Sequence, residues 1–339
     1  MDSSTDILNT VNLSIGFGAG TDREKALMTP LDLSVRQGEM AALIGPNGIG
    51  KSTLLRTIAG LHPALKGDVL ISRQKPEQYM RPELAKKISF VFTGLATVYN
   101  MSVFELVSLG RFPHTNWLGR LTDKDRAIVE RSIASVGLAD HSRSNVSELS
   151  DGEKQRAMIA RALAQDTELI LLDEPTAFLD LPNRYELVYL LRRLASENNK
   201  SVIFSSHDIH IAIREVDKVW LASEDGITQG APEDLALNGV FDKLFAGSDL
   251  TFIRGEGVFT YPVRTRMTIK LEGSGLLLYW TERALNRLGI KAGKNAVSPS
   301  ITIVSDGKLN NWIYKSSVSE RQFKDIYSLI LYMKGVLRS

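Results

Sequence analysis

The sequence has no cysteine among its 339 residues, and this absence excludes disulfide bridges and metal sites built on thiolates. Long hydrophobic runs are absent too, because segments such as LILL (169–172) and LLLYW (276–280) fall far short of the ~20 apolar residues of a membrane-spanning helix. The first ten residues, MDSSTDILNT, contain two acids and no apolar stretch, so we expect no secretory signal. A hydrophobic content of 43% is nevertheless sufficient for a sizeable core.

The net charge of +2 conceals an uneven distribution along the chain. Residues 251–339 hold 14 Lys and Arg against 6 Asp and Glu, whereas residues 1–250 hold 27 against 33. A step in charge of this size is typical of a domain boundary. We therefore predict one domain over residues 1–250 and a small basic accessory domain over residues 258–339.

The first 250 residues alternate short apolar runs with amphipathic stretches, a pattern typical of an α/β domain with a mostly parallel sheet. Three apolar runs lead into a glycine or end in polar residues: EMAALIG (39–45), LILLDE (169–174) and SVIFSSHD (201–208). Their aliphatic character indicates strands that are buried on both faces. Because ligands bind beyond the carboxyl ends of parallel strands, we expect the three endings to converge on one site.

A glycine loop follows the first of these strands. The segment GPNGIGKST (45–53) fits the pattern G-x-x-x-x-G-K-[ST] and leads into a helix with an apolar face. In this pattern backbone N–H groups surround a phosphate, Lys51 reaches the β- and γ-phosphates, and the Ser52 hydroxyl ligates Mg²⁺. The alternative is an ordinary glycine turn, which the strand–loop–helix context disfavours. The predicted nucleotide-binding residues of the loop are Gly45, Pro46, Asn47, Gly48, Gly50, Lys51, Ser52 and Thr53.

Two acids and a histidine end the other two strands. Asp173 is placed to hold Mg²⁺ through water, and Glu174 is placed to act as the general base on the water that attacks the γ-phosphate. His207 is predicted to contact the γ-phosphate or that water. The alternatives are acids that are merely solvated in a turn, and a metal pair of His207 with His210 that lacks a third obvious ligand. The nearby phosphate loop favours the catalytic interpretation.

A second glycine-marked helix start, LSDGEKQRAMIARALA, begins at residue 149. Ser150 and Glu153 have the spacing of a capping box, and Asp151 in the first turn suits the helix dipole. A stable helix start therefore explains the residue types, but it does not explain why the segment lies just ahead of LILLDE.

The order of these motifs resembles that of the ATP-binding subunit of an ABC transporter, over residues 5 to about 250. The resemblance rests on the phosphate loop, the LSDGE segment (149–153), the strand that ends in Asp-Glu, the segment AFLD (177–180) and the histidine after the third strand. It implies an ABC ATPase fold, in which a P-loop domain has a mostly parallel sheet, an antiparallel β part and a helical subdomain at about 94–160. It also implies an ATPase with ATP and Mg²⁺ as cofactors.

The resemblance assigns further residues to the nucleotide site. The LSDGE segment, with Ser150, Gly152 and Glu153, would face the γ-phosphate of ATP held by a partner subunit. A head-to-tail pair with a second copy of the chain is therefore implied, with Asp180 at the shared interface. Phe17 lies where the family stacks an aromatic ring on adenine, and core packing is the alternative.

The chain departs from the family's pattern at two places. The family's usual segment is Leu-Ser-Gly-Gly-Gln, and we expect Asp151 and Glu153 to cap the helix here and leave Ser150 and Gly152 free to face phosphate. After ISFVF the family normally has a glutamine that touches Mg²⁺ and relays to the permease, whereas this chain has Thr93. Thr93 is therefore not assigned as a ligand.

The segment MSVFELVSLGRFPHT (101–115) is similar to one found in ATPases of importers of iron chelates, haem and cobalamin. It implies import of an iron chelate (ferric siderophore), haem or cobalamin through a separate integral membrane permease, usually with a substrate-binding protein. The chain would then be cytoplasmic and peripheral on the inner face of the membrane. The alternative for the segment is a surface helix ended by Pro113.

A soluble ABC ATPase that acts on ribosomes or DNA is the rival function. Such proteins usually carry two cassettes or a long coiled coil, and neither is present in this sequence. We therefore expect no stable nucleic-acid partner, although the basic tail keeps this alternative open.

The basic tail shows no family resemblance of its own. Its pattern predicts a β-α-β-β-α module with a strand at 263–272, a helix closed by Gly289, a hairpin at Asp306-Gly307 and a last helix that starts with a capping box of Ser317 and Glu320. Its positive charge fits a solvated face, contact with anionic lipid headgroups, or a site for a small anionic ligand.

Overall fold

The computed structural model describes residues 6–92, 100–116, 119–177, 179–244, 249–293, 296–305 and 309–338. The chain divides into two compact units, one formed by residues up to 247 with 252–258, the other by residues 248–251 with 259 onward. Each unit contains its own cluster of buried apolar side chains. Within the described segments, no helix has both the length and the apolar character needed to span a bilayer.

The main sheet of the first unit consists of β4 (Met40–Ile44), β6 (Ile88–Val91), β7 (Leu169–Leu172), β8 (Ser201–Ser206), β9 (Lys218–Ser223) and β10 (Gly226–Gly230). Their order is β10-β9-β4-β8-β7-β6, and all neighbours pair in parallel except β10 with β9. Every residue of β4, β7 and β8 is buried, as expected for strands covered on both faces.

The antiparallel part consists of β1 (Asp6–Phe17), β2 (Lys25–Leu31), β3 (Ser34–Arg36) and β5 (Lys66–Ile71). Strand β1 is central, because it pairs with the other three. Its buried side chains share one core with helix α1 (Lys51–Ile58) and with alternate residues of β4, Ala41 and Leu43. Alternate residues lie on the same face of a strand, so this core joins the antiparallel sheet and α1 to one face of the parallel sheet.

Helices surround the remaining surface of the parallel sheet. Helix α6 (Leu181–Asn198) contacts β8, and α7 (Ile209–Glu215) contacts β4. Helices α8 (Pro232–Leu237) and α9 (Val240–Lys243) follow β10. The shorter elements of this part are the 3₁₀ helix η2 (Pro76–Gln78), α2 (Arg81–Leu84), β11 (Thr251–Ile253) and β12 (Val258–Thr260).

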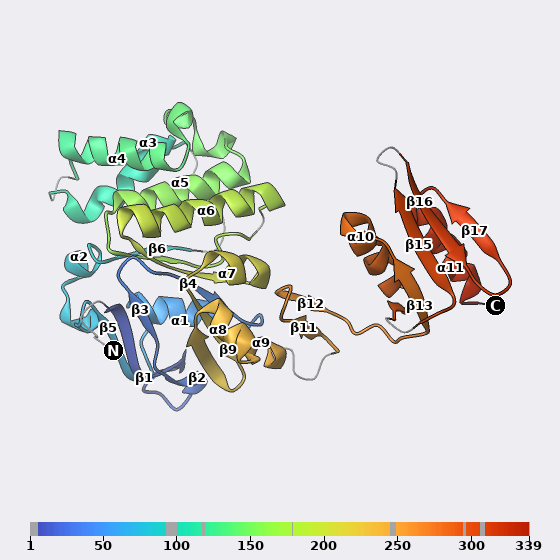
Figure 1. Ribbon diagram of the computed structural model, residues 1–339. Helices are drawn as coiled ribbons and strands as arrows, with labels where there is room; N and C mark the ends of the chain where they lie inside the picture. Colours follow the sequence, from blue (N-terminus) through green and yellow to red (C-terminus); the bar gives the residue numbers. More distant parts are fainter. Residues whose placement is uncertain are drawn as a thin grey trace. The chain divides into compact units, whose positions relative to one another are not determined.

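A cluster of helices lies together in the upper part of the first unit in Figure 1. It comprises α3 (Val103–Ser108), the 3₁₀ helix η3 (Leu109–His114), α4 (Asp123–Ser135), the 3₁₀ helices η4 (Ala139–His141) and η5 (Val146–Glu148), and α5 (Asp151–Ala164). Helices α3, α4 and α5 contact one another. Ser102, Thr122 and Ser150 cap the three helices, since each hydroxyl accepts a hydrogen bond from the amide three residues later.

The second unit has strands β13 (Met267–Glu272), β14 (Ile290–Ala292), β15 (Ser300–Ser305), β16 (Asn310–Lys315) and β17 (Glu320–Phe323), with helices α10 (Gly275–Asn286) and α11 (Ile326–Val336). The strand order is β14-β13-β15-β16-β17. Both helices contribute to the same buried core as the sheet, through residues such as Leu285 and Leu329. Both helices therefore cover the same face of this sheet.

The predicted β-α-β-β-α pattern of the tail is wrong by two strands, β14 and β17. The capping box expected at Ser317 and Glu320 does not form, because Glu320–Phe323 is strand β17. Phe323 lies opposite Trp312 of β16, and both side chains belong to the core, so strand pairing overrides the local capping pattern. Helix α11 starts instead at the N-cap Asp325.

The strand predicted at 263–272 begins only at Met267. Within it, the expected alternation holds, since Met267, Ile269 and Leu271 all contact the core of the second unit. The predicted hairpin at Asp306-Gly307 lies outside the described residues.

Candidate functional site

The three predicted strand endings meet at one edge of the parallel sheet. Ile44 of β4 lies opposite Ser206 of β8, and Leu172 of β7 lies opposite Phe204 of β8. The residues that follow these strands therefore emerge side by side. Side-chain contacts join all three endings, which confirms the predicted convergence.

The loop after β4 passes close to its neighbouring strand. A Cβ atom at Gly45 would lie 2.7 Å from the carbonyl oxygen of Ala222 in β9, so a side chain does not fit there. Gly50, just before α1, has a φ of +114°, which other residues rarely adopt. The intervening Pro46, Asn47 and Gly48 are exposed. The loop thus presents its backbone to solvent at a helix N-terminus, an arrangement that binds phosphate.

Lys51 begins α1, with Ser52 and Thr53 in the same turn, and its ammonium group turns back over the loop. The Lys51 Nζ atom donates to the carbonyl oxygens of Gly45 (2.9 Å) and Pro46 (3.0 Å). Burial lowers the pKa of Lys51, while the charges of the two acids after β7 oppose this shift. A buried cation therefore lies between the loop and the acids.

Asp173 directly follows β7 and is almost fully buried, with 1% of its surface exposed. Its Oδ1 atom accepts hydrogen bonds from Ser52 Oγ and from Ser205 Oγ, both at 2.9 Å. The carboxylate is thus held between the phosphate loop and the end of β8. Carboxylate and hydroxyl oxygens are ligands that Mg²⁺ accepts, so this pair of donors fits the ion.

Glu174 has a φ of +48°, a left-handed conformation that is uncommon for a glutamate. Its Oε1 atom lies 2.6 Å from His207 Nε2. An ionised carboxylate only accepts hydrogen bonds, so His207 carries its proton on Nε2. The other ring nitrogen, Nδ1, lies 3.4 Å from Lys51 Nζ and accepts from it. His207 therefore bridges Lys51 and Glu174, the predicted general base.

Ser150 caps helix α5 in the predicted capping box. The backbone N–H of Ser150 donates to Glu153 Oε2 at 2.8 Å, and the Ser150 hydroxyl donates to the same oxygen at 2.7 Å. These hydrogen bonds lower the pKa of Glu153. The Ser150 hydroxyl thus directs its proton to Glu153, and the expectation that Ser150 and Gly152 face a partner's phosphate stays a prediction. Asp151 instead lies on the exposed side, 3.8 Å from Lys154.

Gly152 is buried beneath the start of helix α6. A Cβ atom there would lie 3.1 Å from Asn183 Oδ1. Asn183 is itself held by Asp180, the N-cap of α6, because Asn183 Nδ2 donates to Asp180 Oδ1 at 2.6 Å. Among the described residues, no hydrogen bond or ion pair links Ser150 or Gly152 to the phosphate loop of the same chain.

Phe17 lies at the end of β1 with 51% of its surface exposed. Its ring contacts His62 edge-on, with 5.9 Å between the ring centroids. His62 in turn hydrogen-bonds through Nε2 to the carbonyl oxygen of Gly16. Core packing therefore does not account for Phe17, whose ring is open to a stacking partner.

Thr93 lies outside the described residues.

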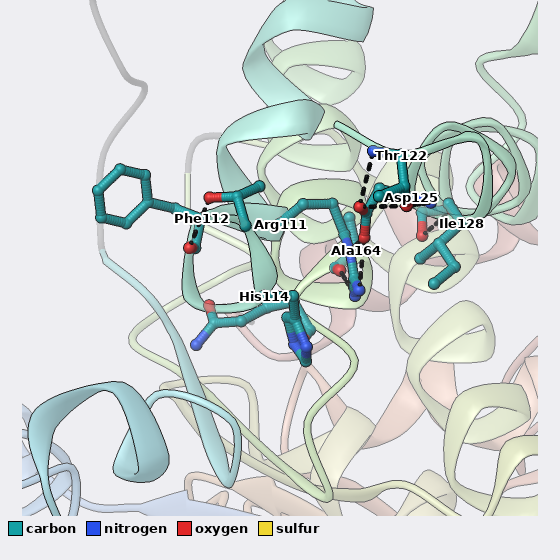
Figure 2. Close-up of polar contacts among 10 residues, drawn as sticks. Arg111, Phe112, His114, Thr122, Asp125, Ile128 and Ala164 are labelled. Carbon is teal, nitrogen blue, oxygen red and sulfur yellow. Dashed lines mark hydrogen bonds and ion pairs between the residues drawn. The ribbon is translucent and has the colours of Figure 1, made fainter. Parts of the chain in front are cut away.

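The segment 101–115 forms α3 and η3, and its Arg111 and His114 are anchored to the end of α5. Arg111 Nη1 donates to the carbonyl oxygen of Ala164, and its Nη2 lies 2.8 Å from Asp125 Oδ1. His114 Nε2 hydrogen-bonds to the carbonyl oxygen of Gln165. Figure 2 shows Arg111 reaching toward Asp125 and Ala164 while the Phe112 ring points away from them.

Phe112 is therefore an exposed aromatic side chain on a fixed support. Its surface is 75% exposed, whereas the adjacent Arg111 is 4% exposed. The ion pair is stabilised further by Thr122, whose hydroxyl donates to Asp125 Oδ2 at 2.6 Å. Hydrogen bonds from Thr122 and the pairing with Arg111 lower the pKa of Asp125 to about 2.

Two positioning residues were not identified from the sequence. Ser205 is fully buried and connects Asp173 with the backbone N–H of Glu174, which donates to its hydroxyl at 2.8 Å. The polar ending of SVIFSSHD indicates the edge of the site, but only the register of β8 beside β7 shows which serine faces the acids. Asn183 is the second, and no motif in the sequence indicates its contact with Gly152.

Comparison with known proteins identifies the class of the molecule. The profile of the family described as ABC transporter matches residues 28–177, and the profile described as iron ABC transporter C-terminal domain matches residues 266–334. An uncharacterized ABC transporter ATP-binding protein of Methanocaldococcus jannaschii, MJ0873, is 36% identical over 273 residues, which cover 79% of this chain and 92% of that protein. The chain belongs to the ABC transporter family as an ATP-binding subunit, and it is an ATPase.

Relatives with named cargo are also similar to this chain. The iron(3+)-hydroxamate import ATP-binding protein FhuC of Bacillus subtilis is 37% identical over 207 residues, covering 61% of this chain and 75% of FhuC. The cobalamin import ATP-binding protein BtuD of Halobacterium salinarum is 34% identical over 239 residues, which cover 68% of this chain and 60% of BtuD. Such relatives favour a transporter over an ATPase that acts on ribosomes or DNA.

A solved structure shows the same fold. The dimeric structure of MJ0796, a bacterial ABC transporter cassette, matches with a TM-score of 0.58 and 26% identity, over 66% of this chain and 98% of that chain. The predicted fold of the first unit, with its mostly parallel sheet, antiparallel part and helical cluster, is confirmed.

Proposed function

We propose that this ATPase energises import of an iron chelate such as a ferric siderophore, of haem or of cobalamin, through a separate membrane permease. The names of FhuC and BtuD support this class of cargo. Iron chelate is the first choice, because the tail matches the profile of the iron ABC transporter C-terminal domain. The observation that carries the proposal is the presence of a converged nucleotide site and of that tail in one chain.

In this proposal the phosphate loop and Lys51 bind the phosphates of ATP. Lys51 exchanges its contacts with the Gly45 and Pro46 carbonyl oxygens for phosphate oxygens. Ser52 and Asp173 would hold Mg²⁺, Asp173 through water, because their oxygens lie 2.9 Å apart at the loop. When bound, this ion neutralises charge on the phosphate oxygens.

Glu174 is the proposed general base. It lies beside the loop with a partly exposed carboxylate, and His207 fixes the orientation of that carboxylate through Nε2–H. A base must be within hydrogen-bond reach of the proton that it removes, so an oriented carboxylate at this edge favours attack by a water molecule on the γ-phosphate. His207 Nδ1 also lies 3.4 Å from Lys51 Nζ, so the histidine connects the proposed general base with the lysine that binds phosphate.

We further propose that two copies of the chain enclose two ATP molecules head to tail. Ser150 and Glu153 are hydrogen-bonded to each other, and in the part that the structure describes neither they nor Gly152 are hydrogen-bonded to the phosphate loop of their own chain. In this proposal the three residues therefore belong to the nucleotide site of a partner. The MJ0796 cassette is dimeric in its solved structure. Asp180 would lie at the shared interface, beside Asn183 and Gly152. Phe17 would stack on adenine.

The chain would lie on the cytoplasmic face of the membrane, with residues 101–115 against the permease and a substrate-binding protein on the other side. Residues 1–250 would form the ATP-binding domain and residues 258–339 an accessory domain. Exposed Phe112, held by its anchored neighbours, is the side chain that we place in the permease contact.

Reconstitution of the chain with its permease in liposomes tests the proposal. ATP hydrolysis and uptake are measured with a ferric hydroxamate, haem and cobalamin, each with wild-type chain and with Glu174→Gln as the inactive control. We expect one cargo class to be taken up only with the wild-type chain and ATP. Stimulation of hydrolysis by ribosomes or DNA, with none by the permease, would overturn it.

A further inference from the structure

The second unit contains an open surface cavity of about 580 Å³ whose basic lining residues are all exposed. Nine residues line it, and five of them are basic. The basic residues are Arg264, Arg266, Arg287, Lys334 and Arg338. The other four are apolar, so the described lining contains no acidic side chain.

Three segments that are distant in sequence bring these cations together. Arg264 and Arg266 precede β13, and the backbone N–H of Arg266 donates to the carbonyl oxygen of Gly289 at 2.7 Å. A Cβ atom at Gly289, which has a φ of +77°, would lie 2.4 Å from the Arg264 carbonyl oxygen, so the close approach of the two segments requires glycine. Arg287 caps the C-terminus of α10 just before this contact. Lys334 lies in the last turn of α11, and Arg338 follows two residues after its end.

The five cations lack the partners that four other basic residues of this unit have. Lys270 and Lys315 form ion pairs with Glu272 and Glu320, and Arg283 and Arg321 lie over aromatic rings. In the described part of the chain, none of the five cavity side chains has an ion pair, a hydrogen bond or a ring contact of this kind. Helix C-termini favour nearby cations, which accounts for those on α10 and α11. It does not account for Arg264 and Arg266, which lie on no helix.

We propose that this cavity binds a phosphate group carried on an organic body. Four guanidinium groups provide planar donor pairs that match phosphate oxygens, and they also neutralise more than one negative charge. The apolar residues, among them Leu288 and Leu337, offer contact to a carbon skeleton. The volume lies in the range of about 300–1,000 Å³ that is typical of small-molecule sites. A soluble organic phosphate and a lipid headgroup share this chemistry.

Calorimetric titration of the full chain tests the proposal, with fructose 1,6-bisphosphate as the soluble probe. Sedimentation with phosphatidylglycerol or phosphatidylcholine vesicles tests the lipid source. The cavity variant is Arg266→Gln with Arg287→Gln. The matched control, Lys291→Gln with Lys324→Gln, removes the same charge from exposed side chains of the same unit that do not line the cavity.

We expect the cavity variant to bind one probe at least about tenfold more weakly than the wild type, and the control to change that binding less than about twofold. Binding of the wild type should also weaken at high salt. Loss confined to phosphatidylglycerol vesicles assigns a lipid headgroup, and loss confined to fructose 1,6-bisphosphate assigns a soluble ligand. Equal loss in variant and control, or no binding of either probe, overturns the proposal. Arg264→Gln with Lys334→Gln repeats the test if the first variant melts at a lower temperature than the wild type.

Discussion

Ser205 Oγ donates a hydrogen bond to Asp173 Oδ1 at 2.9 Å from a fully buried position at the end of β8. The same hydroxyl accepts the backbone N–H of Glu174. A single side chain thus positions both acids of the candidate site relative to the neighbouring strand. The relative position of Asp173 and Glu174 therefore depends on Ser205, a side chain from the neighbouring strand.

Ser205→Ala removes both hydrogen bonds. We expect the free energy of unfolding to fall by about 1–3 kcal/mol, because the N–H of Glu174 loses its partner, and kcat for ATP hydrolysis to fall while ATP affinity changes little. Urea denaturation and steady-state kinetics measure the two effects. Ser196→Ala, at an exposed position of α6, is the control. Normal kcat in a destabilised Ser205→Ala protein would restrict Ser205 to a structural role.

Glu174→Gln keeps the shape of the side chain and removes its basicity. We expect ATP to bind with near-normal affinity and hydrolysis to slow by about 100- to 10,000-fold, which is the range for a lost general base. Fluorescent-nucleotide binding and phosphate release are the measurements. Glu197→Gln, on the exposed face of α6, should leave both unchanged. Turnover near that of the wild type in Glu174→Gln would refute the assignment.

Gly152→Asp tests the role of the LSDGE segment toward a partner's nucleotide. We expect hydrolysis to stop while the isolated chain still binds ATP, because a carboxylate at this position repels a γ-phosphate without touching the chain's own phosphate loop. A side chain here also presses on Asn183. Gly152→Ala is therefore the control, since it keeps the steric contact without the charge. If Gly152→Ala loses hydrolysis to the same extent, the effect is steric.

The buried pair of Arg111 and Asp125 predicts a pH dependence of stability. The pKa of Asp125 is lowered to about 2 from an ordinary value of 3.8. A carboxyl whose pKa is lower in the folded state stabilises the protein above pH 3.8, and this contribution is lost as the pH falls toward 2. Chemical denaturation between pH 5 and pH 2 should show a steeper loss for the wild type than for Asp125→Asn. Asp123→Asn, in the same turn but exposed, should keep the wild-type slope.

Phe112→Ala separates folding from coupling to the permease. Because the ring is 75% exposed, its removal should change the melting temperature and the basal ATPase activity of the isolated chain very little. Stimulation by the permease in liposomes should fall severalfold. Leu237→Ala, which is also 75% exposed but lies on α8 outside residues 101–115, is the matched control. Full stimulation of the Phe112→Ala protein would remove this side chain from the proposed permease contact.

The candidate site was largely predictable because its residues lie directly after buried strands. Apolar runs locate such strands, and parallel pairing brings the residues after Ile44, Leu172 and Ser206 together at one edge. The contact of Asn183 with Gly152 was not predictable, because it depends on how α6 packs over the start of α5. Sequence spacing carries no information on such packing.

The tail shows the limit of local patterns more clearly. Ser317 and Glu320 have the spacing of a helix cap, yet Phe323 pairs with Trp312 and joins the core of the sheet. Burial of two large aromatic side chains stabilises more than a single exposed cap, so the segment becomes a strand. Only the tertiary structure shows which of the two patterns prevails.

The left-handed backbone of Glu174 has a consequence for stability. A φ of +48° disfavours a glutamate by about 1 kcal/mol or more, whereas glycine adopts it freely. The fold alone would therefore be more stable with glycine at this position, which would leave the strand edge without its carboxylate. Engineering for thermal tolerance would therefore select against the proposed general base. With Glu174 as the proposed base, a less stable backbone at residue 174 is the cost of a carboxylate at this strand edge.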